Sequence, residues 1–295
     1  MITDDRRAHN VGMTCILLCM LMWGVLPIYW KSLIPIDSYV IILYRVLLVG
    51  VSCLIAVLAT RGPSGIKEHL AEKGKVVKLF LAGVVITVNW SIFIYGVNSG
   101  QVIETCIGYY IEPLVVCIFG IVLFKERPNK FKMIAIGFAC IGVAIVLAHF
   151  GRLPFIALTL AVTFATYTAI KKHLLMPALI SLFLETVFIA PVALGVLVYL
   201  EANGAGAFST GQPHQLVLLA LAGVLTATPL ALFTAAANRI SMISVGIAEY
   251  ISPSISLLIG IFFFKEPFDH VQFMAFVFIW VGLVFFTYGE IRGGR

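Results

Sequence analysis

The sequence predicts an all-α membrane protein whose ten transmembrane helices form two inverted-topology five-helix repeats. Three observations lead to this prediction. The chain of 295 residues is 61% hydrophobic and only 12% charged, with a mean hydropathy of +1.06. Its apolar residues gather in runs of membrane-spanning length. A segment in the fourth of these runs is nearly repeated in the ninth.

The composition excludes a soluble protein. A soluble domain carries about 25% charged residues, and a chain with 12% could not cover its surface in water. The apolar runs are long enough for helices, because a helix needs about 20 residues to cross roughly 30 Å of hydrocarbon. Strands of a membrane barrel would be about 10 residues long and would alternate in polarity. The runs do not alternate, so helices are expected.

Ten helices account for the apolar runs. The first run leads into Lys31 without a small-residue cleavage site, which indicates a retained helix rather than a signal peptide. The connections are short, and the longest polar inserts are residues 61–75 and 201–213. In chain order we expect helices over residues 11–30, 39–60, 76–98, 103–124, 131–149, 154–173, 178–200, 214–238, 244–264 and 270–289.

The net charge of +6 is distributed unevenly between the two sides of the predicted bundle. The loops and ends on the side of both termini hold 16 of the 20 Lys and Arg residues, and the other side holds three. The remaining one, Arg45, lies inside the second span. By the positive-inside rule, both termini face the cytoplasm. We therefore expect a multi-pass protein of the cell (inner) membrane, with no nucleic-acid partner.

The internal repeat has a constant offset of 140 residues. Residues 109–126 read "YYIEPLVVCIFGIVLFKE" and residues 249–266 read "EYISPSISLLIGIFFFKE". The two copies share Tyr-Ile-x-Pro, Gly-Ile and Phe-Lys-Glu in register. The chain is therefore predicted to consist of two halves, 1–150 and 151–295, with five spans each. Because five is odd, the second half must be inverted relative to the first.

Inverted halves are typical of secondary transporters, in which two repeats rock about one site near the membrane midplane. Each conformation then opens the site to one side only, which is alternating access. Some channels also have inverted repeats, but the repeat favours a transporter.

Each copy of the repeat places polar groups inside an apolar run. Tyr109 and Glu112 are three residues apart and share a helix face, as do Glu249 and Ser252 in the second copy. A proline follows directly in both copies and frees the carbonyl four residues before it, so we expect both helices to be kinked. Such polarity within a bilayer is expected to face the bundle interior or a water-filled cavity.

The two acids allow two mechanisms. An ionised Glu112 or Glu249 could bind a cationic substrate, with aromatic rings adding cation–π attraction. A buried carboxyl group could instead bind and release a proton and couple transport to it. The sequence leaves both open.

The other polar residues within the spans also have two readings. In the functional reading they line a solvated central cavity with aromatic walls. In the structural reading Arg45 pairs with a carboxylate, hydroxyl groups satisfy local carbonyls, and the Phe-Lys-Glu motifs are interface anchors and inter-helix salt bridges. The candidate substrate-binding residues are Trp23, Tyr44, Arg45, Asn89, Trp90, Tyr109, Tyr110, Glu112, Tyr167, Glu185, Glu249, Tyr250 and Ser252.

The motifs of other protein classes do not occur. The six cysteines lie within or at the start of apolar runs, where they are expected to pack as small hydrophobic residues. No Cys/His metal spacing, HExxH, GxSxG or Walker-type phosphate loop is present. We expect no metal, cofactor or catalytic residue, and a membrane-embedded enzyme is disfavoured. A lipid flippase or a non-transporting receptor of the same architecture is the remaining alternative.

The spans also carry a family resemblance. The segments "MWGVLPIYWK" (22–31) and "GYYIEPLVVCIFGIVLFKE" (108–126) resemble the EamA type of the drug/metabolite transporter superfamily, and its RarD-like subgroup in particular. The resemblance implies cytoplasmic termini, a cavity between the halves and transport of small metabolites without ATP. The residues that fit the family's pattern are Trp23, Arg45, Asn89, Trp90, Tyr110, Glu185 and Tyr250.

Three positions depart from that pattern. Glu112 and Glu249 stand where amides are expected, and Tyr44 stands where a His is expected. The two added acids favour a cationic or amphipathic ligand, or proton coupling. The expected partners are a small-molecule substrate and the lipid bilayer, with a proton as one candidate coupling ion. A monomer and a homodimer both agree with the sequence.

Overall fold

The computed structural model describes residues 2–62, 64, 66, 73–99, 101–151, 154–265 and 270–293. Within these residues, ten helices are long and apolar enough to cross a membrane, which confirms the predicted fold class. The helices of the first half are α1 (Ile2–Lys31), α2 (Ser38–Arg61), α4 (Lys73–Asn98), α5 (Val102–Val122) and α6 (Lys130–Phe150). Those of the second half are α7 (Phe155–Leu174), α8 (Ala178–Ala202), α9 (Ala207–Thr210), α10 (Pro213–Ala237), α11 (Met242–Glu249), α12 (Ile251–Phe262) and α13 (His270–Gly293).

The helix ends differ from the predicted spans by a few residues, except at the start of α1. This helix begins at Ile2 rather than at residue 11, because the polar segment before the apolar run contains no Gly or Pro that would end it. The predicted loop 201–213 contains the single turn α9. Most of the polar insert 61–75 lies outside the described residues.

Polar side chains fix several helix starts. The side chain of Asp37 accepts a hydrogen bond from the backbone N–H of Tyr39 at the start of α2, and Asn129 accepts one from Lys132 at the start of α6. Ser241 caps α11 in the same way. These residues satisfy N–H groups that have no partner within the helix. Together they explain why the apolar runs begin new helices after short connections.

The two copies of the repeated segment differ in continuity. The first copy forms one helix, α5, which passes through Pro113 without interruption. The second copy is divided at Tyr250 into α11 and α12. The same proline in register therefore accompanies a continuous helix in one half and a divided one in the other. The sequence predicted a kinked helix in both copies, and it did not predict that only the second copy would be divided.

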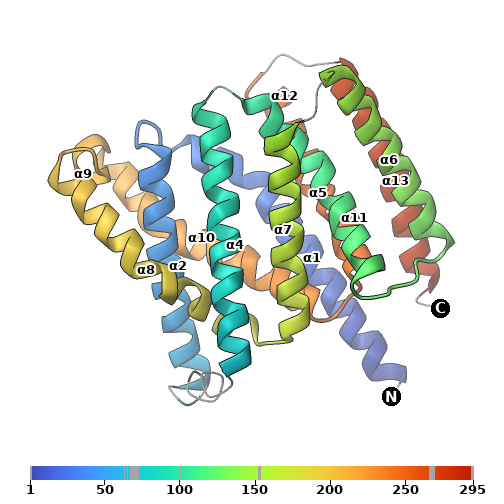
Figure 1. Ribbon diagram of the computed structural model, residues 1–295, viewed down its shortest axis with the longest axis horizontal. Helices are drawn as coiled ribbons and strands as arrows, with labels where there is room; N and C mark the ends of the chain where they lie inside the picture. Colours follow the sequence, from blue (N-terminus) through green and yellow to red (C-terminus); the bar gives the residue numbers. More distant parts are fainter. Residues whose placement is uncertain are drawn as a thin grey trace.

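Contacts between α6 and α13 reveal the relation between the halves. The two helices pack side by side (Figure 1), so closely that a Cβ atom on Gly142 would lie 2.8 Å from the carbonyl oxygen of Ala275. A Cβ atom on Gly282 would lie 3.0 Å from the carbonyl oxygen of Ala135. At the 140-residue offset, Gly282 is the counterpart of Gly142, and Ala275 is the counterpart of Ala135. Exchanging the two halves therefore turns each contact into the other, as a two-fold axis requires. Since the helices are antiparallel, this axis is perpendicular to them, which is the geometry of inverted repeats.

Two further features relate the halves, one repeated in both and one joining counterpart residues. Lys125 and Lys265, which follow the two copies, both have left-handed backbones, with φ of 52° and 55°. The hydroxyl of Tyr250 donates to the carbonyl of its counterpart Tyr110 at 2.9 Å. The repeat in the sequence is thus a repeat in the structure.

Both chain ends lie on one side of the bundle, which we call the terminal side. Glu290 near the end of α13 accepts from His9 in α1 at 2.8 Å and pairs with Lys132 at the start of α6 at 3.0 Å. We call the opposite side, where α2 and α5 begin, the distal side. In Figure 1, α2 and α8 form one end of the molecule and α6 and α13 the other, with α1, α5, α7, α10 and α11 between them.

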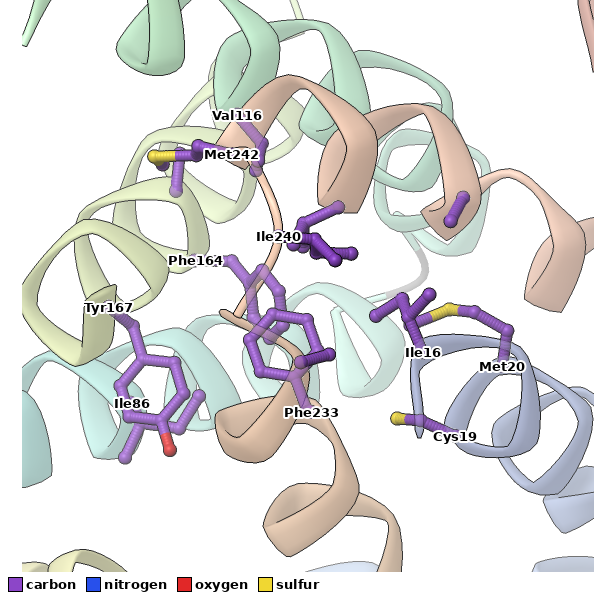
Figure 2. Close-up of a cluster of buried hydrophobic side chains, with 14 of the residues drawn as sticks. Ile16, Cys19, Met20, Ile86, Val116, Phe164, Tyr167, Phe233, Ile240 and Met242 are labelled. Atoms are coloured by element: carbon purple, nitrogen blue, oxygen red, sulfur yellow. The ribbon is translucent and has the colours of Figure 1, made fainter. Parts of the chain in front are cut away.

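A hydrophobic cluster fills the space between these middle helices toward the terminal side. It joins Ile16 and Met20 of α1 with Phe164 of α7, Phe233 of α10 and Met242 at the start of α11 (Figure 2). All five side chains are buried. The cluster therefore packs these helices against one another toward the terminal side.

Candidate functional site

Arg45 lies in the second turn of α2, about 10 Å from the distal end of that helix. Its guanidinium carbon is 4.4 Å from the ring centroid of Trp30 and 5.0 Å from that of Trp90. Its Nε donates to the hydroxyl of Thr226 at 3.3 Å. Aromatic rings from α1 and α4 therefore contact the cation, while one side chain of α10 accepts a hydrogen bond from it.

No carboxylate lies within ion-pair distance of Arg45 in the part of the chain that the structure describes. A guanidinium carries five N–H donors, and only the Nε proton has an acceptor among the described residues. The carboxylate pairing that the structural reading of the sequence required for Arg45 is therefore not observed. Its terminal nitrogens remain available to an acceptor from outside the protein.

Tyr109 and Glu112 lie three residues apart on α5. Tyr109 has 44% of its surface exposed, and its ring centroid is 6.0 Å from that of Phe93. Arg45 and Glu112 are half-buried. Tyr109 interacts electrostatically with both Arg45 and Glu112.

Glu249 is a buried acid without a partner among the described residues. Its side chain is buried, with 4% exposure, at the last residue of α11. Neither carboxylate oxygen has a hydrogen-bond partner in the described part of the chain. It interacts electrostatically with another acid, Glu112. A buried polar group without a partner is rare and costly in a native protein, so this carboxylate requires an explanation.

These residues form one set, which we call the central site: Trp30, Arg45, Trp90, Tyr109, Glu112 and Glu249. It joins α1, α2, α4 and α5 of the first half to α11 of the second. By helical rise, Arg45 is about 10 Å from the distal end of its span, Glu112 about 15 Å and Glu249 about 20 Å. The cation is thus nearest the distal side and the acids are deeper.

Other predicted site residues form hydrogen bonds or ion pairs outside the central site. Asn89 donates to the carbonyl of Leu160 at 2.9 Å and to the hydroxyl of Thr163 at 2.8 Å, which ties α4 to α7. Glu185 accepts from Tyr167 at 3.2 Å and pairs with the buried Lys171 at 2.5 Å. These contacts tie helices together, as the structural reading of the sequence suggested.

The remaining candidates are also held by protein contacts. The hydroxyl of Tyr44 donates to Glu201 at 2.8 Å near the distal side. Trp23 packs against Phe164 and Phe233, with ring centroids 6.1 and 5.4 Å away. Tyr110 and Tyr250 are buried and bonded to each other, and Ser252 is half-buried in the first turn of α12.

Two important residues were absent from the predicted site. Trp30 lies in the segment 22–31 that carries the family resemblance, but only the structure shows that its ring contacts Arg45. Lys171 was counted among the loop cations, whereas it lies in α7 with 1% exposure and neutralises Glu185. Its position before the end of a predicted span was the one available signal.

Within the described residues, no group of three or more His, Cys, Asp or Glu side chains is arranged to hold a metal ion. A cavity of about 460 Å³ lies against the N-terminal part of α1 and is lined by Arg6, Arg7, Asn10, Val11, Thr14 and Cys15. It contains none of the predicted site residues.

Comparison with protein families now identifies the class of the molecule. The EamA-like transporter family matches residues 10–148 and again residues 153–288, one match for each half. The chain belongs to the EamA-like transporter family. The resemblance inferred from the sequence is therefore confirmed, and the chain is a multi-pass membrane transporter.

Several relatives in the EamA family are similar over their full lengths. An uncharacterized transporter, YojE, of Bacillus subtilis (strain 168) is 39% identical over 279 residues, which cover 93% of each chain. A protein RarD of Streptomyces exfoliatus is 34% identical, covering 93% of this chain and 87% of the relative. A protein RarD of Escherichia coli (strain K12) is 31% identical, covering 99% and 98%.

The fold is also found in a solved structure. A protein of known crystal structure superposes with a TM-score of 0.72, covering 95% of this chain and 96% of the other, at 16% sequence identity. At that identity the likeness concerns the fold alone, and it places the EamA-family chain among proteins of the same architecture.

Proposed function

We propose that this EamA-family protein is a secondary transporter that moves small metabolites or drugs by alternating access, with the central site as its binding site. One observation carries the proposal. Arg45, Glu112 and Glu249 are ionisable, lie within membrane-spanning helices and have no ion-pair partner among the described residues. Charged groups within a membrane are retained for a function by default. Their place between inverted halves is where such transporters bind substrate.

A polar clamp supports closure of the terminal side in this conformation. Glu126, which follows α5, accepts from the backbone N–H groups of Met242 and Ile243 at 2.7 and 3.0 Å. Lys172 of α7 lies 3.6 Å from Glu126 and donates to the carbonyl of Ile240 at 2.5 Å. The clamp joins the first half to the second next to the hydrophobic cluster. Opening toward the terminal side would require both to separate.

The charge distribution suggests the orientation. Because the terminal side carries most of the Lys and Arg residues, the positive-inside rule assigns it to the cytoplasm. The conformation described here is then closed toward the cytoplasm, in the cell membrane.

Efflux of compounds from proteoliposomes tests the proposal. Liposomes with purified protein are loaded with a mixture of metabolites, and the compounds lost to the outside are identified by mass spectrometry. We expect at least one compound to leave liposomes with the wild-type protein and to stay in those with Glu249→Gln. Arg239→Gln is the matched control, because Arg239 is exposed and bonds only within its own helix end. If no compound leaves faster than from protein-free liposomes, the transporter proposal fails.

A thermal-shift screen in detergent identifies the compounds to follow. A ligand present at 100 times its dissociation constant stabilises the folded state by about 2.7 kcal/mol. Organic cations, amino acids, nucleosides and small aromatic drugs form the first panel. Flux of the ligand with and without a proton gradient then separates direct binding of a cation by the acids from proton coupling.

A further inference from the structure

We propose that α11 is the gate of the terminal side, and that it swings away from α5 about a hinge at Tyr250 while α12 stays in place. This inference rests on the proposed function and names the segment that moves when the terminal side opens. It is carried by the break at Tyr250, by the bonds on either side of that break, and by the contact between α11 and α5.

The hinge is the interruption between α11 and α12 at Tyr250. The backbone N–H of Tyr250 donates to the carbonyl of Ile247, three residues back, at 3.4 Å, as in a 3₁₀ turn. A 3₁₀ stretch within a helix often marks a functional hinge. Pro253 has no N–H, so it cannot bond the carbonyl of Glu249 across the break. The hydroxyl of Tyr250 donates to the carbonyl of Tyr110 in α5 at 2.9 Å, which fixes the position of the hinge.

Beyond the hinge, α12 is bonded to neighbours in both halves. The hydroxyl of Ser254 accepts from the indole N–H of Trp280 in α13 at 2.9 Å. The hydroxyl of Ser256 donates to the carbonyl of Gly24 in α1 at 3.1 Å. Gly24 lies so close to α12 that an added Cβ atom would be 2.6 Å from the Cβ of Ile255. These contacts hold α12 in place on two sides.

Before the hinge, α11 is bonded to other helices at its first turn. Glu126 accepts from the N–H groups of Met242 and Ile243, and the thiol of Cys117 lies 3.6 Å from the carbonyl oxygen of Ile243. At the opposite end of α11, Glu249 has no hydrogen-bond partner among the described residues. The segment is thus latched at its start and hinged at its end, which is the arrangement of a gate.

The contact between α11 and α5 is made at two points through glycines. An added Cβ atom on Gly246 would lie 2.6 Å from the carbonyl oxygen of Pro113 and 2.9 Å from the sulfur of Cys117. One on Gly120 would lie 3.0 Å from Cγ1 of Ile243. Small residues let helices in a membrane approach closely. Because glycine has no side chain, the helices can separate at these points without a change of rotamer.

Movement of α11 would open the bundle toward the terminal side. All eight residues of α11 are buried. Met242, Val245 and Ala248 belong to the hydrophobic cluster that also contains Cys19 of α1 (Figure 2). Glu249 at the hinge would gain access to water, whereas its burial without a partner is costly in the closed form. That cost favours opening, and the clamp at Glu126 opposes it.

Hydrogen–deuterium exchange of the full-length protein in nanodiscs tests the hinge without any ligand. Peptides from residues 242–249 and 251–262 are followed by mass spectrometry. We expect the amides of α11 to exchange roughly tenfold or more faster than those of α12, because only α11 opens locally. Equal rates in the two segments would show that Tyr250 is not a hinge and would overturn the inference.

A pair of glycine variants tests which contact opens. Gly246→Ala should wedge α11 off α5, because the added methyl group would meet the carbonyl oxygen of Pro113 at 2.6 Å. Gly142→Ala is the matched control. Its methyl group would lie 2.8 Å from the carbonyl oxygen of Ala275, in the contact between α6 and α13, which stays closed when the gate moves.

The readout for both variants is the rate at which the buried thiol of Cys19 reacts with a maleimide, relative to the exposed Cys106. We expect Gly246→Ala to raise this rate roughly tenfold and Gly142→Ala to leave it within about twofold of the wild type. Should Gly246→Ala fail to fold, the exchange rates of the wild-type protein still decide the question.

Two outcomes of the labelling would overturn the inference. An equal rise in both variants would show that the halves separate as rigid bodies, without a gate helix. An unchanged rate in a folded Gly246→Ala protein would show that α11 does not leave α5. The transporter proposal is judged apart from this, because efflux from proteoliposomes would leave it standing even if residues 242–262 exchange uniformly.

Discussion

Two carboxylates are equally buried in this protein and have opposite surroundings. Glu185 is 3% exposed and Glu249 is 4% exposed. Glu185 pairs with Lys171 at 2.5 Å and accepts from Ser181 at 2.8 Å and from Tyr167 at 3.2 Å. Glu249 accepts no hydrogen bond from any residue that the structure describes.

The difference shows that burial alone does not identify a functional acid in a membrane. The charge of Glu185 is compensated within the second half of the chain by neighbours on α7 and α8, so it can serve packing. Glu249 interacts electrostatically with Glu112 of the first half and has no hydrogen-bond partner among the described residues. The missing partner, rather than the buried charge, marks the place where a substrate or a proton is expected.

The largest effect should come from breaking the compensated pair. Lys171→Met leaves Glu185 as a buried carboxylate without its cation, and removing one partner of a buried ion pair costs about 3–5 kcal/mol. We expect the melting temperature in detergent to fall by roughly 10 °C. Adding Glu185→Gln to this variant should recover part of the loss, because the orphaned charge is then removed. A drop of only a degree or two in the single variant would show that the pair does not hold α7 to α8.

A smaller effect is expected at the terminal clamp. Glu126→Gln weakens the charge-assisted bonds to Met242 and Ile243 and the pairing with Lys172, which is worth about 1–3 kcal/mol. Because the clamp helps to close the terminal side, the buried thiol of Cys117 should react faster with a maleimide. Labelling is followed by mass spectrometry, with the exposed Cys106 as internal reference. Equal rates at Cys117 in both proteins would contradict a role of the clamp in closure.

The smallest effect is expected at Tyr44, which distinguishes it from its neighbour Arg45. Tyr44→Phe removes one hydrogen bond to Glu201, so stability should fall by about 1 kcal/mol or less. Ligand affinity should not change, since this hydroxyl is directed to the end of α8 and not to the central site. A clear loss of affinity in Tyr44→Phe would extend the binding site toward Glu201.

Much of the fold followed from the sequence, because the signals were local or periodic. The apolar runs predicted the ten spans, and the 140-residue offset predicted two inverted halves, to which the contacts of Gly142 and Gly282 conform. The division of the second copy at Tyr250 did not follow, since Pro113 in the first copy leaves α5 continuous. What surrounds each copy, rather than its own residues, decides between the two forms.

The candidate site was predicted only in part. The acids stood out because charge within an apolar run is costly, and Arg45 stood out for the same reason. Their partners could not be read from the chain, because they come from other helices. Lys171 reaches Glu185 across the turn between α7 and α8, and Trp30 reaches Arg45 from α1. Such pairings depend on packing, which a single sequence does not show.

The most direct test of the central claim compares Glu249→Gln with Glu185→Gln in the absence of ligand, by thermal unfolding in the same detergent. Glu185→Gln leaves Lys171 uncompensated and should lower the melting temperature by roughly 10 °C. Glu249→Gln removes a carboxylate that has no hydrogen-bond partner within the described ranges and should leave the melting temperature unchanged or raise it. If Glu249→Gln lowers it as far as Glu185→Gln does, Glu249 is a structural residue and the central site is not a binding site.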